Sequence, residues 1–258
     1  MNLTYVNQGD AATALTASSA ATGYPASNVQ FPFKTKTWRS TGVTDEWLKW
    51  NLGSAQNVTM VALVNTNLTA AATVYFCGHA SDLGNATASW HGHATVDETI
   101  TIPAGGMVIK YFTGASKQWW FLGVAPAGAG TYVEIGLVYF GAQYSPAQNF
   151  DVKYKHALSD PSVAVKSIGG QRHTDMRPQF ASLSLNFKFM TKAQKNQFLA
   201  FFQTVGVFNE VILSLDPAND PNGLSFYGVF TGGLSFTGSM QNATTDYHDL
   251  ALNFEESL

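Results

Sequence analysis

The sequence predicts a mainly β protein: a β-sandwich over residues 1–148, then an α+β domain over 149–258 with one helix on antiparallel strands. Short runs rich in β-branched and aromatic residues recur between turn residues in the first part. The second part contains a single amphipathic helix. Charge density also changes, with 13 charged residues in 1–150 and 18 in 151–258. The polar, proline-containing stretch 141–149 has the composition of a linker between the two.

The first part is predicted to be all-β, with the strand pattern of a β-sandwich. Within 47–52, Leu48, Trp50 and Leu52 alternate with other residues and therefore share one face of a strand. No stretch in this part has a helical period. The predicted strands cover residues 47–52, 58–64, 73–78, 99–102, 108–112, 119–124 and 134–140.

The second part contains the clearest helix signal. Thr191 precedes the apolar stripe as an N-cap, and Gln194 three residues later completes a capping box. Gly206 stands where a C-terminal glycine belongs. The predicted helix stripe is Phe198, Leu199, Phe202 and Val205. The predicted strand before it turns Leu183, Leu185, Phe187 and Phe189 inward. Strands at 211–215, 224–230, 234–237 and 247–255 follow, the last with Leu250, Leu252 and Phe254 inward.

Composition narrows the function classes. Charged residues make up 12% of the chain, about half of the roughly 25% of an average soluble domain. A poorly charged surface usually needs covering, which favours a part of a larger assembly. The net charge of -3 and the pI near 6.0 argue against a dedicated nucleic-acid binder. The N-terminal residues lack the features of a signal peptide, and no apolar run is long enough for a membrane helix, so we expect no membrane insertion.

No catalytic motif is evident, so we expect no enzyme, no catalytic residue and no cofactor. Cys77 is the single cysteine and lies in an apolar run, where a buried structural role is usual. The chain has no phosphate-binding loop, no dinucleotide fingerprint and no nucleophile elbow. Paired acids such as Asp45-Glu46 are adjacent, and neighbours on a strand point to opposite faces.

His91 and His93 are the strongest metal candidates, although we expect no metal overall. Residues i and i+2 of a strand share a face, so two imidazoles can converge on one ion. His79 lies nearby in the sequence, but no further ligand is identifiable.

All six tryptophans fall in the first part, and most are expected in its core. Exposed tryptophan rings stack on sugar faces. The candidates for glycan contacts are Trp90, Trp119 and Trp120, with Trp90 and one of the other two expected at the surface.

Charge is uneven in the second part. Six basic residues lie between 166 and 195 against Asp175 alone, whereas the C-terminal end is acidic. Mixed solvated charge is one interpretation. The other is a head-to-tail interface that closes into a ring. Its candidate residues are Arg172, Arg177, Lys192, Lys195, Asp246, Asp249, Glu255 and Glu256.

Four segments between residues 26 and 68 follow one pattern: Ala26-Ser27-Asn28-Val29, Trp38-Arg39-Ser40, the run from Glu46 to Gly53, and 58–64. Together they resemble the discoidin (coagulation factor 5/8 C-type) family. Asn51 replaces the family's usual Asp, and its framing cysteines are absent. The resemblance implies a galactose-binding-like β-sandwich. The family's ligand loops vary, so it carries over no binding residue, and sugar binding stays open.

Residues 151–258 resemble the C-terminal region of tailed-phage minor tail and distal-tail proteins. The resemblance lies in Ser167-Ile168-Gly169-Gly170, in Arg172 and Arg177, in the strand and helix over 183–206, and in the terminal strand over 247–256. It implies a tail-tube-like, ring-forming domain. In distal-tail proteins the tube-like domain often comes first, whereas here the order is reversed.

The leading hypothesis is a structural virion protein of a bacteriophage tail tip or baseplate, made in the host bacterial cytoplasm. A trimeric or hexameric ring would continue the tail tube, with DNA only as passing cargo. The sandwich would face other tail proteins or host surface glycans. The alternative is a carbohydrate-binding module of a phage adhesin or of a bacterial polysaccharide-binding protein.

Overall fold

The computed structural model describes all residues except 104–106, 126–129, 152, 243–244 and 258, and the backbone alone of 239–242 and 245–246. Two compact units emerge. The sandwich unit comprises Asn2–Tyr144 and Ser214–Ser225, and the helix unit comprises Ser145–Leu213 and Phe226–Leu258 together with Met1. In the described residues, no helix is both long and apolar enough to cross a membrane. The division into separate domains at residue 148 stays a prediction.

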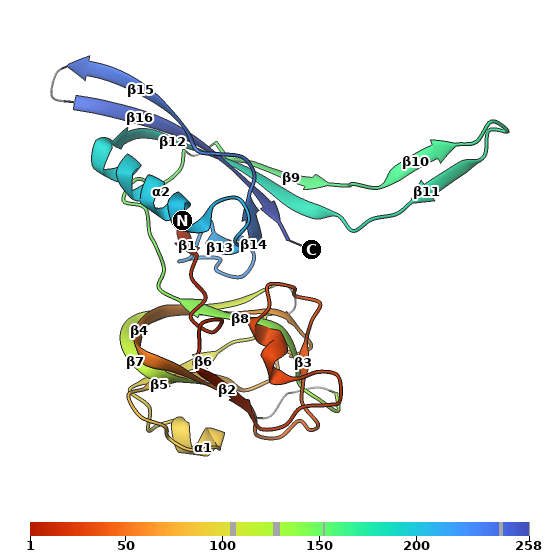
Figure 1. Cartoon of the computed structure of the whole chain (residues 1–258), viewed down its shortest axis with the longest axis vertical. Coiled ribbons are helices and arrows are strands. Elements are labelled where there is room, and N and C mark those ends of the chain that lie inside the picture. Colours follow the sequence, from red (N-terminus) through yellow and green to blue (C-terminus); the bar gives the residue numbers. More distant parts are fainter. Residues whose placement is uncertain (104–106, 126–129, 152, 243–244, 258) are drawn as a thin grey trace. The chain divides into compact units, whose positions relative to one another are not determined.

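The sandwich unit is built on an antiparallel sheet of order β3-β8-β4-β7-β5-β6, with β2 paired to β4 (Figure 1). Leu3 in β1 (Asn2–Thr4) bridges to Tyr144. The other elements are β2 (Ala14–Ala17), the 3-10 helix η1 (Ala26–Gln30), β3 (Trp38–Arg39), β4 (Glu46–Thr66), β5 (Val74–His79), α1 (Thr87–Trp90), β6 (Val96–Ile100), β7 (Val108–Val124) and β8 (Glu134–Gly141).

Two pairs of predicted strands are single long strands. The segments expected at 47–52 and 58–64 belong to β4, and those at 108–112 and 119–124 belong to β7. The pairing of β4 with β7 changes register between Asn51 and Gln56 of β4. Gly53 there has φ +75°, which glycine adopts without strain. The turn residues that separate the apolar runs therefore bend a continuous strand instead of ending it. The short α1 also lies where no helix was expected.

The core explains the low charge of the first part. Leu48, Trp50 and Leu52 are buried in the main core, as their alternation predicted. The opposite face of β4 is buried too, because Trp47 packs with Cys77, Trp90 and Phe121 in a second cluster. In the main core Trp120 stacks on Phe76 with ring centres 5.2 Å apart, and Trp50 meets Phe140 edge-on at 5.2 Å.

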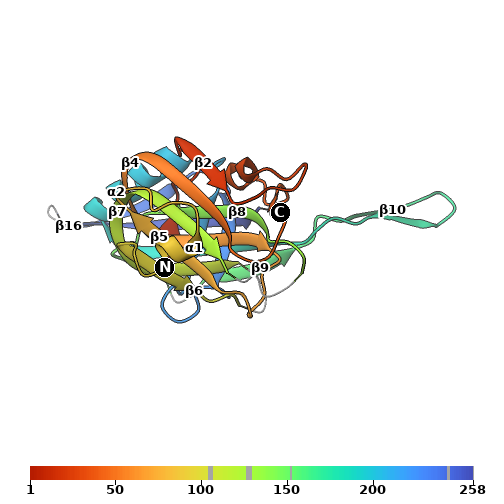
Figure 2. The same ribbon diagram turned by 90° about the horizontal axis from the view of Figure 1, so that it is seen from below.

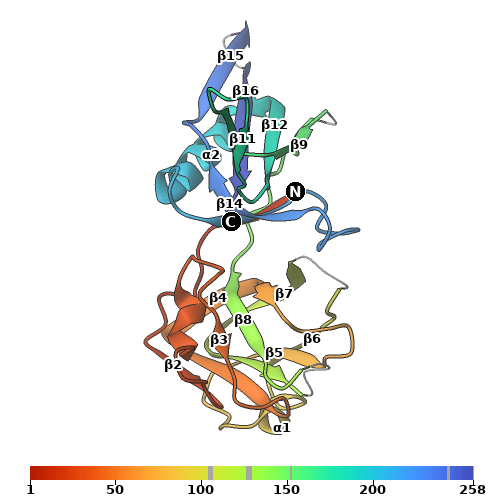
Figure 3. The same cartoon turned by 90° about the vertical axis from the view of Figure 1, so that its right-hand side faces the viewer.

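In the helix unit, α2 (Lys192–Val205) lies on one face of an antiparallel sheet (Figures 1 and 3). The strand order is β13-β14-β16-β12-β9, with β15 paired to β16. The strands are β9 (Lys155–Ser159), β10 (Val163–Lys166), β11 (Arg172–Asp175), β12 (Phe180–Thr191), β13 (Val211–Ser214), β14 (Ser225–Phe230), β15 (Ser235–Asn242) and β16 (Thr245–Glu256). The predicted fold class, mainly β with an α+β second part, is confirmed.

The predicted inward residues of the terminal strand, Leu250, Leu252 and Phe254, are all buried. In β12 the prediction fails at Phe189, which is 64% exposed. A bulge between Phe187 and Met190 shifts the register against β16, so Met190 takes the inward position. Phe189 has φ +55°, a strained conformation for a bulky side chain.

The predicted capping box of α2 is confirmed. The Thr191 hydroxyl accepts from the Gln194 N–H, and the Gln194 side chain accepts from the Thr191 N–H. Gly206 follows as the C-cap, also as predicted. The buried face of α2 is rotated relative to the predicted one. Phe198, Phe201 and Val205 are buried, whereas Leu199 is 36% exposed.

An arm that the sequence did not predict extends from the helix unit. We define it as residues 160–178, in which β10 and β11 form a two-stranded ribbon (Figure 2). It continues the pairing of β9 with β12 beyond the sheet. The arm was missed because its residues have no buried face and therefore no apolar alternation.

The capping box makes a testable contribution to stability. Thr191→Ala removes an acceptor for a helix N–H, and we expect the free energy of unfolding to fall by about 1 kcal/mol. Thr204→Ala is the control, because the Thr204 hydroxyl donates to the carbonyl of Ala200 within the helix and caps no helix N–H. Urea unfolding measures both variants. Equal losses would show that the cap contributes nothing specific.

Candidate functional site

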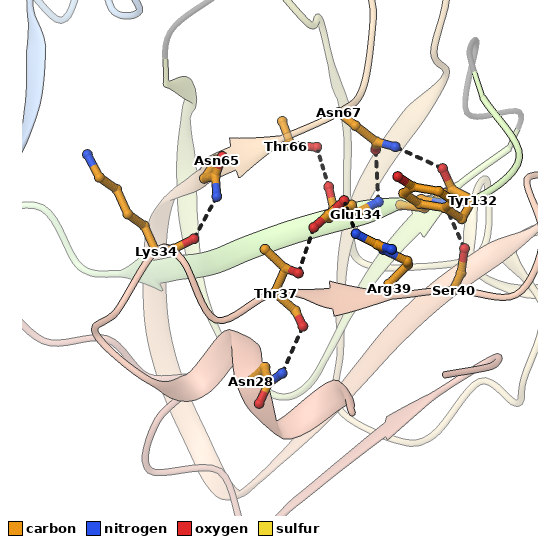
Figure 4. Close-up of polar contacts among 11 residues, drawn as sticks. Asn28, Lys34, Thr37, Arg39, Ser40, Asn65, Thr66, Asn67, Tyr132 and Glu134 are labelled. Atoms are coloured by element: carbon orange, nitrogen blue, oxygen red, sulfur yellow. Dashed lines mark hydrogen bonds and ion pairs between the residues drawn. The ribbon is translucent and has the colours of Figure 1, made fainter. Parts of the chain in front are cut away.

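The candidate site is a polar cluster where β3 meets the start of β8 (Figure 4). Arg39 and Glu134 are directly opposite each other on the two strands. Arg39 Nη2 donates to Glu134 Oε2 at 3.0 Å. The two side chains are 27% and 21% exposed, so the pair is accessible but partly shielded from water. Opposite charges at this cross-strand position stabilise the pairing.

A buried tryptophan holds β3 in place. Trp38 is fully buried, and its indole N–H donates to the carbonyl of Ser19 at 2.9 Å. Arg39 follows it and points to the opposite face, as strand alternation requires. The Arg39 N–H donates to the carbonyl of Tyr24, and the Arg39 carbonyl accepts from Ala21. The loop that carries Tyr24 is therefore fixed against Arg39.

Two tyrosine rings flank the guanidinium. The Arg39 Cζ lies 4.1 Å from the ring centre of Tyr24 and 4.2 Å from that of Tyr132. Both rings are half-buried. The Arg39 Nε atom is buried and has no hydrogen-bond partner among the described residues. The ring contacts restrict the guanidinium, and its exposed part lies on the side away from the buried Nε.

Glu134 is held equally firmly. Its Oε1 accepts from the hydroxyl of Thr37 at 2.7 Å, and Thr37 is buried. The Glu134 N–H donates to Asn67 Oδ1 at 2.8 Å, and its carbonyl accepts from the Thr66 hydroxyl at 2.9 Å. The carboxylate is therefore an acceptor fixed in position and direction.

Side-chain amides tie the surrounding loops to the site (Figure 4). Each amide nitrogen donates to a backbone carbonyl of another loop or strand. The pairs are Asn28 with Thr37 (2.8 Å), Asn65 with Lys34 (2.7 Å) and Asn67 with Tyr132 (2.9 Å). The hydroxyl of Ser40 also accepts from the Val133 N–H at 2.7 Å. Such preorganisation lowers the entropy that a ligand would otherwise lose on binding.

None of the Arg39 cluster was predicted as a site. In the sequence, Trp38-Arg39-Ser40 contributes only to the resemblance to the discoidin family, and Glu134 only begins a predicted strand. Arg39 and Glu134 are 95 positions apart, so no local motif joins them. The sequence holds little signal for this site, because nothing distinguishes Arg39 from the other basic residues among the 14 in the chain.

The predicted glycan contacts lie elsewhere and are largely covered. The surface exposure expected of Trp90 is wrong, because Trp90 is 1% exposed and its ring stacks on Phe121 at 4.7 Å. Trp120 is fully buried in the main core. Both rings fill space between the sheet and its covering segments. Trp119 is half-buried and remains the one of the three with an accessible part.

The candidate metal residues form a different kind of cluster. His91 Nδ1 lies 3.0 Å from Asp97 Oδ1, and the Tyr75 ring stacks on His91 at 4.1 Å. Gly92 N–H donates to Asp97 Oδ2 at 2.6 Å. His91 is thus engaged with a carboxylate, and no interaction joins it to His93. Across the residues that the structure describes, no group of three or more His, Cys, Asp or Glu is arranged to hold a metal ion.

Cys77 belongs to the same cluster and donates to Asp97 Oδ1 at 3.3 Å. Burial raises the pKa of Cys77 far above its ordinary value, and the Asp97 carboxylate raises it further. Partial burial raises the pKa of Asp97, but hydrogen bonds led by His91 lower it more, leaving it below its ordinary value. A buried thiol that stays protonated is a weak nucleophile.

A second polar cluster surrounds Lys49, whose side chain is only 9% exposed. Its ammonium donates to both carboxylate oxygens of Asp82, at 3.1 and 2.9 Å, and to Asn85 Oδ1 at 2.6 Å. The rings of Trp47 and Trp119 lie 5.9 and 5.6 Å away. Partial burial raises the pKa of Asp82, but Lys49 and the Gly84 N–H lower it more, so the net shift is downward. This cluster holds the 82–85 loop against β4.

The predicted interface residues are spread over the helix unit. Arg177 pairs with Asp175 at 2.9 Å, and Asp249 pairs with Lys188 at 2.7 Å. Lys195 lies over the Phe236 ring at 5.7 Å, and Glu256 accepts from the Ala181 N–H. Glu255 lines a pocket of about 320 Å³ together with Lys155, Ser182, Ser184, Thr231 and Asn253. Arg172 lies on the arm, Lys192 begins α2, and the side chain of Asp246 lies outside the described residues. Their interface role stays a prediction.

No family model matches the chain, and no curated protein does either. Similar solved structures include chitosan-binding module 1 from a Paenibacillus sp. IK-5 chitosanase/glucanase, at 24% identity over 54% of this chain and 100% of that one, TM-score 0.42. A Streptococcus pneumoniae fucose binding module matches at 11% identity over 53% and 95%, TM-score 0.42. A family 32 carbohydrate-binding module of C. perfringens NanJ, in complex with galactose, matches at 16% over 55% and 99%, TM-score 0.41. The strand order described above defines the sandwich independently of them.

The Lys49 cluster predicts a pH-dependent stability. Lys49→Met leaves Asp82 without its cation, and we expect the free energy of unfolding at neutral pH to fall by about 1–3 kcal/mol. The folded pKa of Asp82 is lowered, so the stabilisation is complete above its unfolded value near 3.9 and is lost as the pH falls through the folded value. The difference between wild type and variant should shrink there.

Lys188→Met is the matched control, because the Lys188–Asp249 pair is exposed, at 47% and 38%. Its loss should stay under about 1 kcal/mol. Urea unfolding at a series of pH values measures both variants. A Lys49→Met loss no larger than that of the control would contradict the role assigned to the cluster.

Proposed function

We propose that the sandwich unit is a saccharide-binding module and that the Arg39–Glu134 cluster is its site. One observation carries the proposal: a partly exposed guanidinium is held between two tyrosine rings beside a fixed carboxylate. Sugar hydroxyls both donate and accept, and sugar rings present apolar C–H faces. A donor, an acceptor and aromatic surface in one rigid place match that chemistry.

The charges of the site favour a neutral saccharide. Arg39 and Glu134 form an ion pair at 3.0 Å, so their formal charges cancel. An acidic sugar would approach the Glu134 carboxylate, and like charges at short range repel. A neutral sugar meets no such cost, since its hydroxyls accept from Arg39 and donate to Glu134.

The saccharide site is tested through Arg39. Arg39→Lys keeps the charge but loses the planar array of donors. We expect the affinity for a neutral oligosaccharide to fall at least about tenfold, or roughly 1.4 kcal/mol. A glycan array carrying neutral galactose-, fucose- and glucosamine-based oligosaccharides and their acidic counterparts selects the probe. Isothermal titration with that probe and the full chain then gives the affinities.

Arg177→Lys is the control, since Arg177 makes a comparable pair with Asp175 in the helix unit. Its affinity should equal that of the wild type. Equal affinities of Arg39→Lys and wild type would overturn the site. Absence of binding to any saccharide on the array would overturn the function.

A second candidate function concerns the helix unit, and the exposed arm favours it. We propose that the chain is a structural component of a bacteriophage tail tip or baseplate, whose helix unit forms a ring in the virion and whose sandwich unit faces host glycans. The resemblance of residues 151–258 to tail proteins supports this. So do apolar side chains of the arm that are 48% or more exposed, Val163, Val165, Ile168 and Met176, because such surface is usually covered.

The ring is tested by the mass of the full chain in solution. We expect three or six copies per particle by analytical ultracentrifugation, with negative-stain images of matching symmetry. Lys192→Glu should weaken the association, because it reverses a predicted interface charge, while Lys36→Glu on the sandwich unit should not. A monomer at every attainable concentration would contradict self-assembly.

A further inference from the structure

One turn of the sandwich unit holds an asparagine directly before a glycine, at Asn222-Gly223. This is the only Asn-Gly pair in the sequence. In such a pair the backbone nitrogen of the glycine can attack the side-chain carbonyl of the asparagine, because the two atoms close an unstrained five-membered ring. Glycine has no side chain to obstruct the approach. The rate in a folded protein therefore depends on what each of the two atoms contacts.

The turn is firmly built by its own hydrogen bonds. Residues 214–225 belong to the sandwich unit. The Asp220 N–H donates to the Asp216 carbonyl at 3.1 Å, and the Leu224 N–H donates to the Asp220 carbonyl at 3.4 Å. The Asp216 carboxylate accepts from the N–H of Asn219 at 3.2 Å and from its side-chain amide at 3.0 Å. The groups in the turn are therefore held in fixed positions.

A backbone N–H polarises the side-chain carbonyl of Asn222. Asn222 Oδ1 accepts from the N–H of Ile109, in β7 of the same unit, at 2.8 Å. This donor withdraws electron density from the Asn222 Cγ. It also faces the oxygen on which negative charge develops when Cγ is attacked. Its distance is that of the donors that stabilise oxyanions in enzymes.

The attacking nitrogen has an acceptor of its own. The Gly223 N–H donates to Asp220 Oδ1 at 2.8 Å. A carboxylate within hydrogen-bond reach of the proton that has to leave can act as a general base. The approach requires glycine, because a Cβ at position 223 would lie 2.5 Å from Asp220 Oδ2. The turn thus brings a base to the nucleophile and an oxyanion donor to the electrophile.

We propose that the fold promotes the deamidation of Asn222 to aspartate and isoaspartate, with Asp220 as the base and the Ile109 N–H as the oxyanion donor. The Gly223 nitrogen forms a bond to Asn222 Cγ while its proton passes to the Asp220 carboxylate. The Cγ–Nδ2 bond then breaks, and Nδ2 takes up the proton and leaves as ammonia. The product of this step is a succinimide.

Water completes the reaction by opening the succinimide ring at either of its carbonyls. Attack at Cγ gives aspartate at position 222 and restores the original backbone. Attack at the backbone carbonyl gives isoaspartate, in which the main chain runs through the former side chain. The sum of the two steps exchanges one ammonia for one water, and no oxidant or reductant is involved.

The first test compares the folded full chain with the same chain unfolded in urea. Both samples are incubated at the same neutral pH and temperature. Peptide mapping by mass spectrometry follows the peptide that contains residue 222, and chromatography separates its aspartate and isoaspartate forms. We expect Asn222 to react at least about tenfold faster in the folded chain, because only the fold supplies the base and the donor. An equal or lower rate in the folded chain would overturn the proposal.

The second test removes the base and keeps its hydrogen bond. Asp220→Asn retains an oxygen that accepts from the Gly223 N–H, and we expect its folded-state rate to fall to about that of the unfolded chain. Asp216→Asn is the matched control, because it removes the same charge from the same turn while its side chain bonds Asn219. Its rate should equal that of the wild type.

Both new asparagines precede a proline, whose nitrogen carries no proton, so neither variant adds a comparable reactive pair. Urea unfolding confirms that each variant is folded, and the first test needs no variant at all. A folded-state rate of Asp220→Asn equal to that of the wild type, or an equal fall in both variants, would overturn the role of Asp220.

Discussion

The sandwich unit depends on the burial of both faces of the first half of β4. Trp50 packs into the main core on one side, and Trp47 packs against Trp90 and Phe121 on the other. Because two aromatic layers share one strand, β4 fixes the positions of β7, β5 and β2, which pair with it directly or through one strand. Few charged side chains fit such a doubly covered sheet. Its low charge is thus in part a consequence of packing.

The elements that the sequence predicted well have local signals. The capping box of α2 requires only Thr191 and Gln194, and the terminal strand requires only alternation at Leu250, Leu252 and Phe254. The failures have non-local causes. Phe189 turns outward because an extra residue of β12, in a bulge against β16, moves Met190 inward, and a pattern of alternation does not encode a bulge that arises from pairing with another strand. The two long bent strands likewise depend on tertiary pairing.

The candidate site was beyond sequence prediction for the same reason. Arginine, glutamate and tyrosine are ordinary surface residues. Only the pairing of β3 with β8 brings Arg39 and Glu134 together as a candidate site. Tryptophan residues predict sugar contacts only where their rings are exposed. In this unit the buried tryptophan rings pack in the core. The aromatic surface beside Arg39 comes from the half-exposed Tyr24 and Tyr132 instead. Residue type alone did not distinguish these roles.

The pairing of Arg39 with Glu134 joins residues 95 positions apart, and this separation affects how the site forms. Closing so long a loop lowers the conformational entropy of the chain. Contacts among the surrounding strands offset this loss only once those strands have formed. The site therefore does not exist in a partly folded sandwich unit, and no short fragment around Arg39 reproduces it. Any ligand that binds only the completed site stabilises the whole unit through mass action. Ligand binding and the folding of the sandwich unit are therefore linked equilibria.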